Sequence, residues 1–328
     1  MEGAAGNRSA EFLFIFISWY FIVLYTGCGF NAFGYWRSGH RAVGAGSRLL
    51  WCGNACGLGV MVLAEKKGAG SVRILLTIAY DGTNYSGWQK QKMPEVPTVE
   101  GKVEEALQAL FCQPGLECIG ASRTDRGVHA LGQRAVVDVQ TTIPTEKIPL
   151  AIRRFLPEDI VVTSAQEVPT TFHPRYDCVK KTYCYQIYQD RYPNPKERLY
   201  SAFSKRQLDI EKMKEGAAVL VGTHDFAAFC AAGSSVSSTV RTIFDCHVEQ
   251  EEKYIRIFVT GDGFLYNMVR IIAGTLMAVG AGKMPPRQIA EIIAGKDRRQ
   301  AGQTAPPQGL TLLEISYDLP QKSLDSGF

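Results

Sequence analysis

Apolar positions recur with two different spacings between residues 72 and 318. A spacing of two, or a short apolar run bounded by turn residues, predicts a strand, and a spacing of three to four predicts a helix. The pattern predicts strands at 72–80, 116–120, 134–140, 160–166, 182–188, 240–249, 254–260 and 310–317. It predicts helices at 99–110, 146–155, 210–220, 266–281 and 286–294. Thr98 is suited to cap the first of these helices.

Some predicted strands follow one another directly, whereas others are separated by helices. This mixture favours an α+β fold with large mixed, partly antiparallel sheets over a doubly wound parallel sheet. A polar linker, Y-P-N-P-K at residues 192–196, divides the pattern, and the order of strands and helices recurs on both sides. We therefore expect two similar α/β subdomains, at 72–190 and 191–318, followed by a tail at 319–328.

The first 71 residues have a different composition. They contain 13 of the 32 glycines and three of the four tryptophans. An apolar run at residues 12–25, interrupted only by Ser18, is shorter than the ~20 residues that a membrane span needs. We interpret this leader as a poorly structured, non-catalytic extension, with an organelle transit peptide or a membrane anchor as alternatives. The protein is expected to be intracellular, in the cytoplasm, the nucleus or, with a transit peptide, an organelle, without stable membrane association.

The overall charge does not predict a nucleic-acid-binding protein. The chain of 328 residues is 46% hydrophobic and 21% charged, as in soluble globular proteins. Its formal net charge of +4 includes six basic and three acidic residues in the leader, which leaves a net charge of +1 for the rest. An RNA site would therefore need local clusters of basic residues. The nine cysteines are scattered without a C-x-x-C pair, which predicts reduced thiols and no metal site.

Chemistry is concentrated in the polar segment S-R-T-D-R-G-V-H-A-L-G-Q at residues 122–133. Its carboxylate, Asp125, lies between Arg123 and Arg126 on a predicted loop just before a strand, a position that suits a catalytic group. The two arginines would lower the pKa of Asp125 and keep it ionised, as a nucleophile requires. Taken alone, Asp-x-Gly is also an ordinary turn sequence.

Arg270 interrupts an otherwise apolar predicted helix. A buried guanidinium without a partner costs several kcal/mol, so Arg270 predicts a carboxylate opposite it. Small residues on the same helix face, Ala273 and Gly274, would allow another segment to approach closely. The alternative is an arginine at the helix edge that extends to solvent.

Four motifs, in this order along the chain, resemble the TruA-type tRNA pseudouridine synthase family. Residues 80–91 are similar to its Y-D-G-x-x-Y-x-G-W-Q-x-Q, and residues 122–133 to its G-R-T-D-x-G-V-H-A followed by Gly-Gln, with Ser122 where Gly is usual. Residues 172–176 are similar to F-H-A-R-F, and residues 264–274 to F-x-x-x-M-V-R-x-x-x-G. The resemblance covers roughly residues 72–318.

The resemblance implies the pseudouridine synthase fold, with a central active-site cleft, and isomerisation of uridine to pseudouridine in tRNA. It implies three catalytic residues: Asp125, Arg270 as its partner, and Tyr183, which would stack on a flipped base or transfer a proton. Read from the residues alone, the aromatic side chains near Tyr183 are equally typical of a sheet core. The expected substrate contacts, besides Tyr183, are Arg123, Arg126, His129, Gln133, His173 and Arg175. No metal or cofactor is implied. The expected partners are tRNA, modified in the anticodon stem-loop around positions 38–40, and a second copy of the chain in a homodimer.

Three other functions fit parts of the sequence. A glycosidase-like hydrolase would use a second carboxylate, and none stands out beside Asp125. A non-catalytic RNA-binding module on the same fold would leave Asp125 a purely structural role. A membrane-tethered protein would depend on residues 12–25 alone.

Overall fold

The computed structural model describes residues 13–17, 20–24, 50–53, 59–62, 71–91, 96–233 and 236–319. The chain divides into two compact units, Met1–Gly70 and Ser71–Phe328. The first contains four strands, β1 (Leu13–Ile17), β2 (Tyr20–Leu24), β3 (Leu50–Gly53) and β4 (Gly59–Val62), in the order β1-β2-β4-β3. Most of the apolar run at residues 12–25 thus forms an antiparallel strand pair. No helix in the described part of the chain is long and apolar enough to cross a membrane.

The second unit contains the remaining elements. Its strands are β5 (Val72–Tyr80), β6 (Cys118–Gly120), β7 (His129–Val139), β8 (Ile160–Val168), β9 (Cys178–Gln189), β10 (Ala202–Ser204), β11 (Gly222–Asp225), β12 (Val240–Glu251), β13 (Tyr254–Gly261) and β14 (Leu310–Tyr317). Its helices are α1 (Val99–Phe111), α2 (Ile148–Ile152), α3 (Ile210–Val219), α4 (Met268–Gly280) and α5 (Gln288–Gly295). Short 3₁₀ turns lie at Thr145–Lys147, Arg153–Phe155, Ala227–Phe229, Arg298–Gln300 and Pro307–Gly309.

Most elements of this unit lie where the hydrophobic pattern predicts them. Strands β5 and β14 have the predicted bounds, and the Thr98 hydroxyl accepts a hydrogen bond from the Gly101 amide at 3.3 Å, which confirms the predicted cap of α1. Strands β10 and β11 were not predicted, because three and four residues are too few to show a period. Strand β7 begins five residues before the predicted start at 134, so part of the Asp125 motif is a strand.

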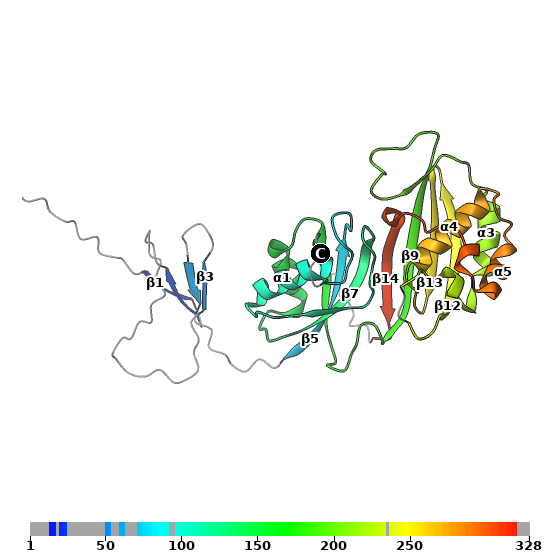
Figure 1. Cartoon of the computed structure of the whole chain (residues 1–328). Coiled ribbons are helices and arrows are strands. Elements are labelled where there is room, and N and C mark those ends of the chain that lie inside the picture. Colours follow the sequence, from blue (N-terminus) through cyan, green and yellow to red (C-terminus); the bar gives the residue numbers. More distant parts are fainter. Residues whose placement is uncertain are drawn as a thin grey trace, which may run out of the picture. The chain divides into compact units, whose positions relative to one another are not determined.

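The strands of the second unit form one ten-stranded sheet. Its order is β11-β12-β13-β9-β14-β7-β5-β8, with β10 beside β9 and β6 beside β7. Most pairs are antiparallel, but β14 runs parallel to β7 and β10 parallel to β9, so the predicted mixed α+β architecture is confirmed. The strands form one sheet, not several, because the last strand, β14, lies between β7 and β9 (Figure 1). The division into subdomains at residue 190 stays a prediction.

The helices and the sheet share one large core. Apolar residues of α1, α3, α4 and α5 join it, together with alternate residues of the strands, such as Ile74 and Leu76 of β5 and Ile257 of β13. A separate, smaller cluster forms around Leu75, whose side chain points to the opposite face of β5. The core therefore supports the sheet along its width, and the connecting loops carry the polar motifs.

The first motif, residues 80–91, packs against the Asp125 loop. The Tyr80 hydroxyl lies 2.7 Å from the Thr124 hydroxyl, and the Trp88 amide donates to the Thr124 carbonyl oxygen at 3.2 Å. Gly87 has a φ of +92°, and a Cβ atom there would overlap the Thr124 carbonyl oxygen. Glycine is therefore required at this contact for its backbone conformation and for space.

We predict that Gly87→Ala lowers the free energy of unfolding by about 2 kcal/mol or more, because it adds a steric overlap to backbone strain. Gly115→Ala is the matched control: Gly115 also has a positive φ, +79°, but nothing lies within 4 Å of its added Cβ. It should cost only about 1 kcal/mol. Urea unfolding of both variants measures the difference. Equal losses would contradict the proposed close approach.

Candidate active site

Asp125 lies on the loop between β6 and β7. The Val128 amide donates to the Asp125 carbonyl oxygen at 3.1 Å and closes the turn. Gln133, fully buried, fixes the start of the loop: its side chain accepts from the Ser122 amide at 3.2 Å and donates to the Ser122 carbonyl oxygen at 2.6 Å. The loop thereby holds the Asp125 side chain at a partly buried position, with 24% of its surface exposed.

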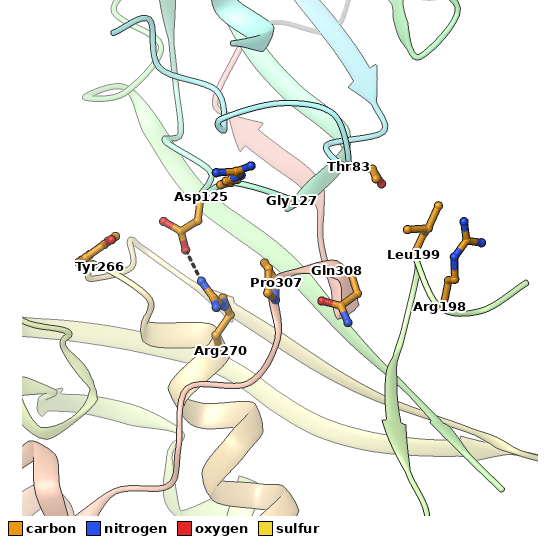
Figure 2. A pocket seen from close by; sticks show the side chains of 10 residues that line it. Thr83, Asp125, Gly127, Arg198, Leu199, Tyr266, Arg270, Pro307 and Gln308 are labelled. Atoms are coloured by element: carbon orange, nitrogen blue, oxygen red, sulfur yellow. Dashed lines mark hydrogen bonds and ion pairs between the residues drawn. The ribbon is translucent and has the colours of Figure 1, made fainter. Parts of the chain in front are cut away.

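Arg270 reaches Asp125 from the first turn of α4. Its Nη1 donates to Asp125 Oδ2 at 3.1 Å and to Asn267 Oδ1 at 2.7 Å, and its Nε donates to the Ala305 carbonyl oxygen at 2.8 Å. Figure 2 shows the two side chains pointing toward each other from different elements. The carboxylate partner predicted for Arg270 is thus confirmed.

The close approach predicted at the small residues of α4 is also present. A Cβ atom on Gly274 would overlap the Gln303 carbonyl oxygen, and the Ala305 amide donates to the Arg270 carbonyl oxygen at 3.1 Å. The chain at 303–305 therefore passes directly over the start of α4. This crossing supplies the carbonyl oxygen that holds Arg270 Nε.

Burial raises the pKa of Asp125 above its ordinary value, and the hydrogen bond and charge of Arg270 offset only part of that rise. The prediction that Arg123 and Arg126 lower this pKa is therefore wrong in direction and in source. Arg123 Nε donates to Gln89 Oε1 at 2.8 Å, and Arg126 is exposed. The charge that acts on Asp125 comes from Arg270, 145 residues further along the chain.

A cavity of about 500 Å³ opens over the Asp125–Arg270 pair (Figure 2). Asp125 is the one acidic residue among the described residues that line it, whereas three arginines, Arg126, Arg198 and Arg270, contribute positive charge. The exposed aromatic side chain of Tyr266 also lines it. The local excess of positive charge suits a polyanionic substrate, although the charge of the whole chain gives no such signal.

Sequence reasoning missed the contribution of the segment that follows the linker at 192–196. Arg198 and Leu199, which the sequence analysis did not single out, line the cavity. Two motif residues, His129 and Asp81, contact this segment. His129 Nε2 lies 2.9 Å from the Leu199 carbonyl oxygen, and Asp81 Oδ2 accepts a hydrogen bond from the Tyr200 hydroxyl at 2.7 Å. The sequence did contain the residues that make these contacts, the Asp-Gly pair at 81–82 and His129. Their spacing along the chain does not indicate that they contact residues 199–200.

His129 is buried, and both its ring nitrogens are engaged. Its Nδ1 lies 3.1 Å from the Gly82 amide nitrogen and 3.1 Å from Asp81 Oδ1, and its Nε2 lies 2.9 Å from the Leu199 carbonyl oxygen. These contacts, like those of Gln133, hold backbone in place. Neither side chain lines the cavity in which Asp125 lies.

Tyr183 lies on β9 with only 5% of its surface exposed. Its hydroxyl is 2.8 Å from the Ser122 hydroxyl, and its ring packs edge-on against Phe264 at 5.2 Å. Burial raises the pKa of Tyr183 to about 12, the nearby Asp125 charge adds to the rise, and the Ser122 hydrogen bond works against it. At neutral pH the phenol is therefore protonated and shares a hydrogen bond with the Ser122 hydroxyl.

The remaining candidate residues lie at a second cavity, of about 260 Å³. It is lined by Arg123, His173 and Arg175, together with Gln89 and Tyr176. The structure thus separates the predicted site residues into three groups: those at the Asp125 cavity, those at this second cavity, and the buried residues Tyr183, His129 and Gln133 that lie behind the loop.

A family model of tRNA pseudouridine synthase matches residues 76–177 and 217–318. Over 245 residues, 75% of this chain, the sequence is 46% identical to tRNA pseudouridine synthase A 2 of Clostridium tetani (strain Massachusetts / E88) and covers 98% of that protein. Over 244 residues, 74% of this chain, it is 47% identical to tRNA pseudouridine synthase A of Thermoanaerobacter sp. (strain X514), 99% of which is covered. The chain belongs to the tRNA pseudouridine synthase family.

Proposed function

We propose that the chain modifies uridines in the anticodon stem-loop of tRNA, roughly at positions 38–40, with Asp125 as nucleophile. The activity of the family, isomerisation of uridine to pseudouridine in tRNA, is the activity of this chain. The observation that supports the assignment of Asp125 is its contact with Arg270 on the wall of a cavity that opens to solvent. Loop uridines suit this cavity because the base must leave the helical stack first.

The reaction breaks the N1–C1′ bond, turns the base and forms a C5–C1′ bond. The C5 proton is lost and N1 gains a proton, so no redox step, metal or cofactor is needed. The ionised carboxylate of Asp125 supplies the electron pair for the covalent step, whether at the sugar or at the base. Arg270 favours that ionised form and fixes the direction of the attacking oxygen.

Tyr183 is proposed as a proton-transferring or base-contacting residue. Its hydroxyl already has a relay partner in Ser122, 2.8 Å away. The Tyr183 ring is buried and packs against Phe264. A base could stack on Tyr183 only if the contact between these two rings were broken. The proton-transfer role agrees better with the protonated, hydrogen-bonded phenol.

Residues of both proposed subdomains, 72–190 and 191–318, line the Asp125 cavity. This supports the family arrangement of two similar halves around a central cleft. We further propose, from the resemblance, that the enzyme is a homodimer and acts inside the cell without stable membrane association. Light scattering at micromolar concentration would test the dimer.

We predict that Asp125→Asn lowers the single-turnover rate of pseudouridine formation at least about 1000-fold and leaves tRNA binding within about threefold of wild type. Asparagine keeps an oxygen for Arg270 but cannot attack. Because burial disfavours the charge of Asp125, the variant should also melt no lower than wild type. Full activity of the variant would leave Asp125 with a structural role.

We predict that Arg270→Gln moves the acidic limb of the pH–rate profile upward by about 1–2 pH units. Without Arg270, the pKa of Asp125 rises further, so the variant should regain part of its rate as the pH increases. Arg270→Lys, which keeps the charge, should move the limb less. A loss that is equal at every pH would show that Arg270 is needed for structure alone.

We predict that Arg198→Gln weakens tRNA binding and lowers the slope of log K against log salt concentration by about 0.7–0.9, the loss of one phosphate contact. Arg299→Gln is the control, because Arg299 is an exposed arginine that lines neither cavity. Fluorescence anisotropy across a salt series measures both. Unchanged slopes for both variants would contradict a phosphate contact at Arg198.

A further inference from the structure

The second cavity lies beside the same loop that carries Asp125. Arg123 lines this cavity, whereas Asp125 and Arg126 line the first one. Two residues of backbone span at most about 7 Å, so the backbone that presents Arg123 to one cavity lies close to the backbone that presents Asp125 to the other.

The turn after β8 is built to display polar side chains at this cavity. Phe172 and Pro174 are buried, and Tyr317 holds them: its ring lies 5.0 Å from the Phe172 ring, and its hydroxyl donates to the Pro174 carbonyl oxygen at 2.7 Å. The His173 amide donates to Asp177 Oδ2 at 2.8 Å and closes the turn. The alternate positions, His173 and Arg175, together with Tyr176, are thereby left at the surface.

Positive charge at the cavity exceeds what its acid can balance. Among the described residues, neither Arg123 nor Arg175 has an ion-pair partner, and Arg123 is held only through Nε. The acid in the lining, Glu100, already accepts from Trp88 Nε1, Gln89 Nε2 and the Lys90 amide. Burial raises the pKa of Glu100, and the charge of Arg123 acts against that rise. The lining thus carries two arginines against one carboxylate, an excess of positive charge that suits an anion.

An aromatic surface lies next to these arginines. Tyr176 is 78% exposed, and one side of its ring faces His173 at 4.3 Å with a tilt of 30°. His173 Nδ1 accepts from the amides of Arg175 and Tyr176, so the ring proton is on Nε2 and can be donated to a ligand. Exposed aromatic rings beside arginines are typical of sites for unstacked bases.

We propose that this cavity binds a nucleotide next to the target uridine, with its base on Tyr176 and its phosphate between Arg123 and Arg175. The inference depends on the proposed function, because the ligand is the same tRNA. The target uridine would lie in the Asp125 cavity and the neighbouring nucleotide in the second cavity, with the Asp125 loop between them. Occupation of the second cavity would hold the target base out of the stack while Asp125 reacts.

The test is a cycle of protein and RNA changes. Dissociation constants are measured for wild type, Tyr176→Ala and Tyr176→Phe with a stem-loop RNA that contains the target uridine. The same RNA is then used with one abasic nucleotide at each of the three positions on either side of the target. Tyr192→Ala is the matched control, because Tyr192 is 67% exposed and lines neither cavity.

Tyr176→Ala should weaken binding about 5- to 100-fold, and Tyr176→Phe and Tyr192→Ala by no more than about twofold. One abasic position should remove the difference between Tyr176→Ala and wild type. A difference that persists at every abasic position, or wild-type binding by Tyr176→Ala, would overturn the proposal. In either case wild type would still form pseudouridine in this stem-loop, whereas failure of the proposed target would leave the stem-loop RNA unmodified by wild type.

Discussion

The partly buried contact between Asp125 and Arg270 is the constraint on which the proposed active site depends. A carboxylate at this depth must be paired, and its partner comes from a helix that starts 143 residues further along the chain. Three segments must therefore meet within a few ångströms: the Asp125 loop, the first turn of α4 and the chain at 303–305 that supplies the Ala305 carbonyl oxygen. The insertion of β14 between β7 and β9 makes the sheet continuous from β7, which follows the Asp125 loop, to β9. The fold thus serves to hold one charge pair at the wall of a cavity.

This arrangement has a cost in folding free energy. A carboxyl group whose pKa is higher in the folded chain than in the unfolded chain contributes stability that is fully present below its ordinary pKa. That contribution is lost as the pH rises through the folded value. Burial places Asp125 in this class, and Arg270 reduces the penalty without removing it. The proposed nucleophile thus needs the ionised form that burial disfavours, a conflict between stability and activity that is common in enzymes.

The sequence predicted much of this site because a buried charge has few acceptable environments. Arg270 stands in an apolar helix, so its need for a carboxylate could be stated without coordinates. The prediction that Arg123 and Arg126 act on the pKa of Asp125 was wrong because side chains adjacent in sequence on a loop can point in different directions. Arg123 donates to Gln89, and Arg126 is exposed. The contact between His129 and residue 199 could not be predicted, because His129 contacts the backbone carbonyl oxygen of Leu199 and not its side chain. Such contacts depend on chain path and not on side-chain type, so composition and spacing do not reveal them.

Several buried polar residues in the motifs form hydrogen bonds with the backbone. Gln133 pairs with Ser122, and His129 joins Gly82 to Leu199. A loop that must hold a nucleophile has no regular hydrogen-bond pattern of its own, so buried side chains must satisfy its amides and carbonyls. The length of the motifs therefore reflects the cost of fixing an irregular loop. We propose that a smaller set of side chains touches RNA, namely the arginines and exposed tyrosines that line the two cavities.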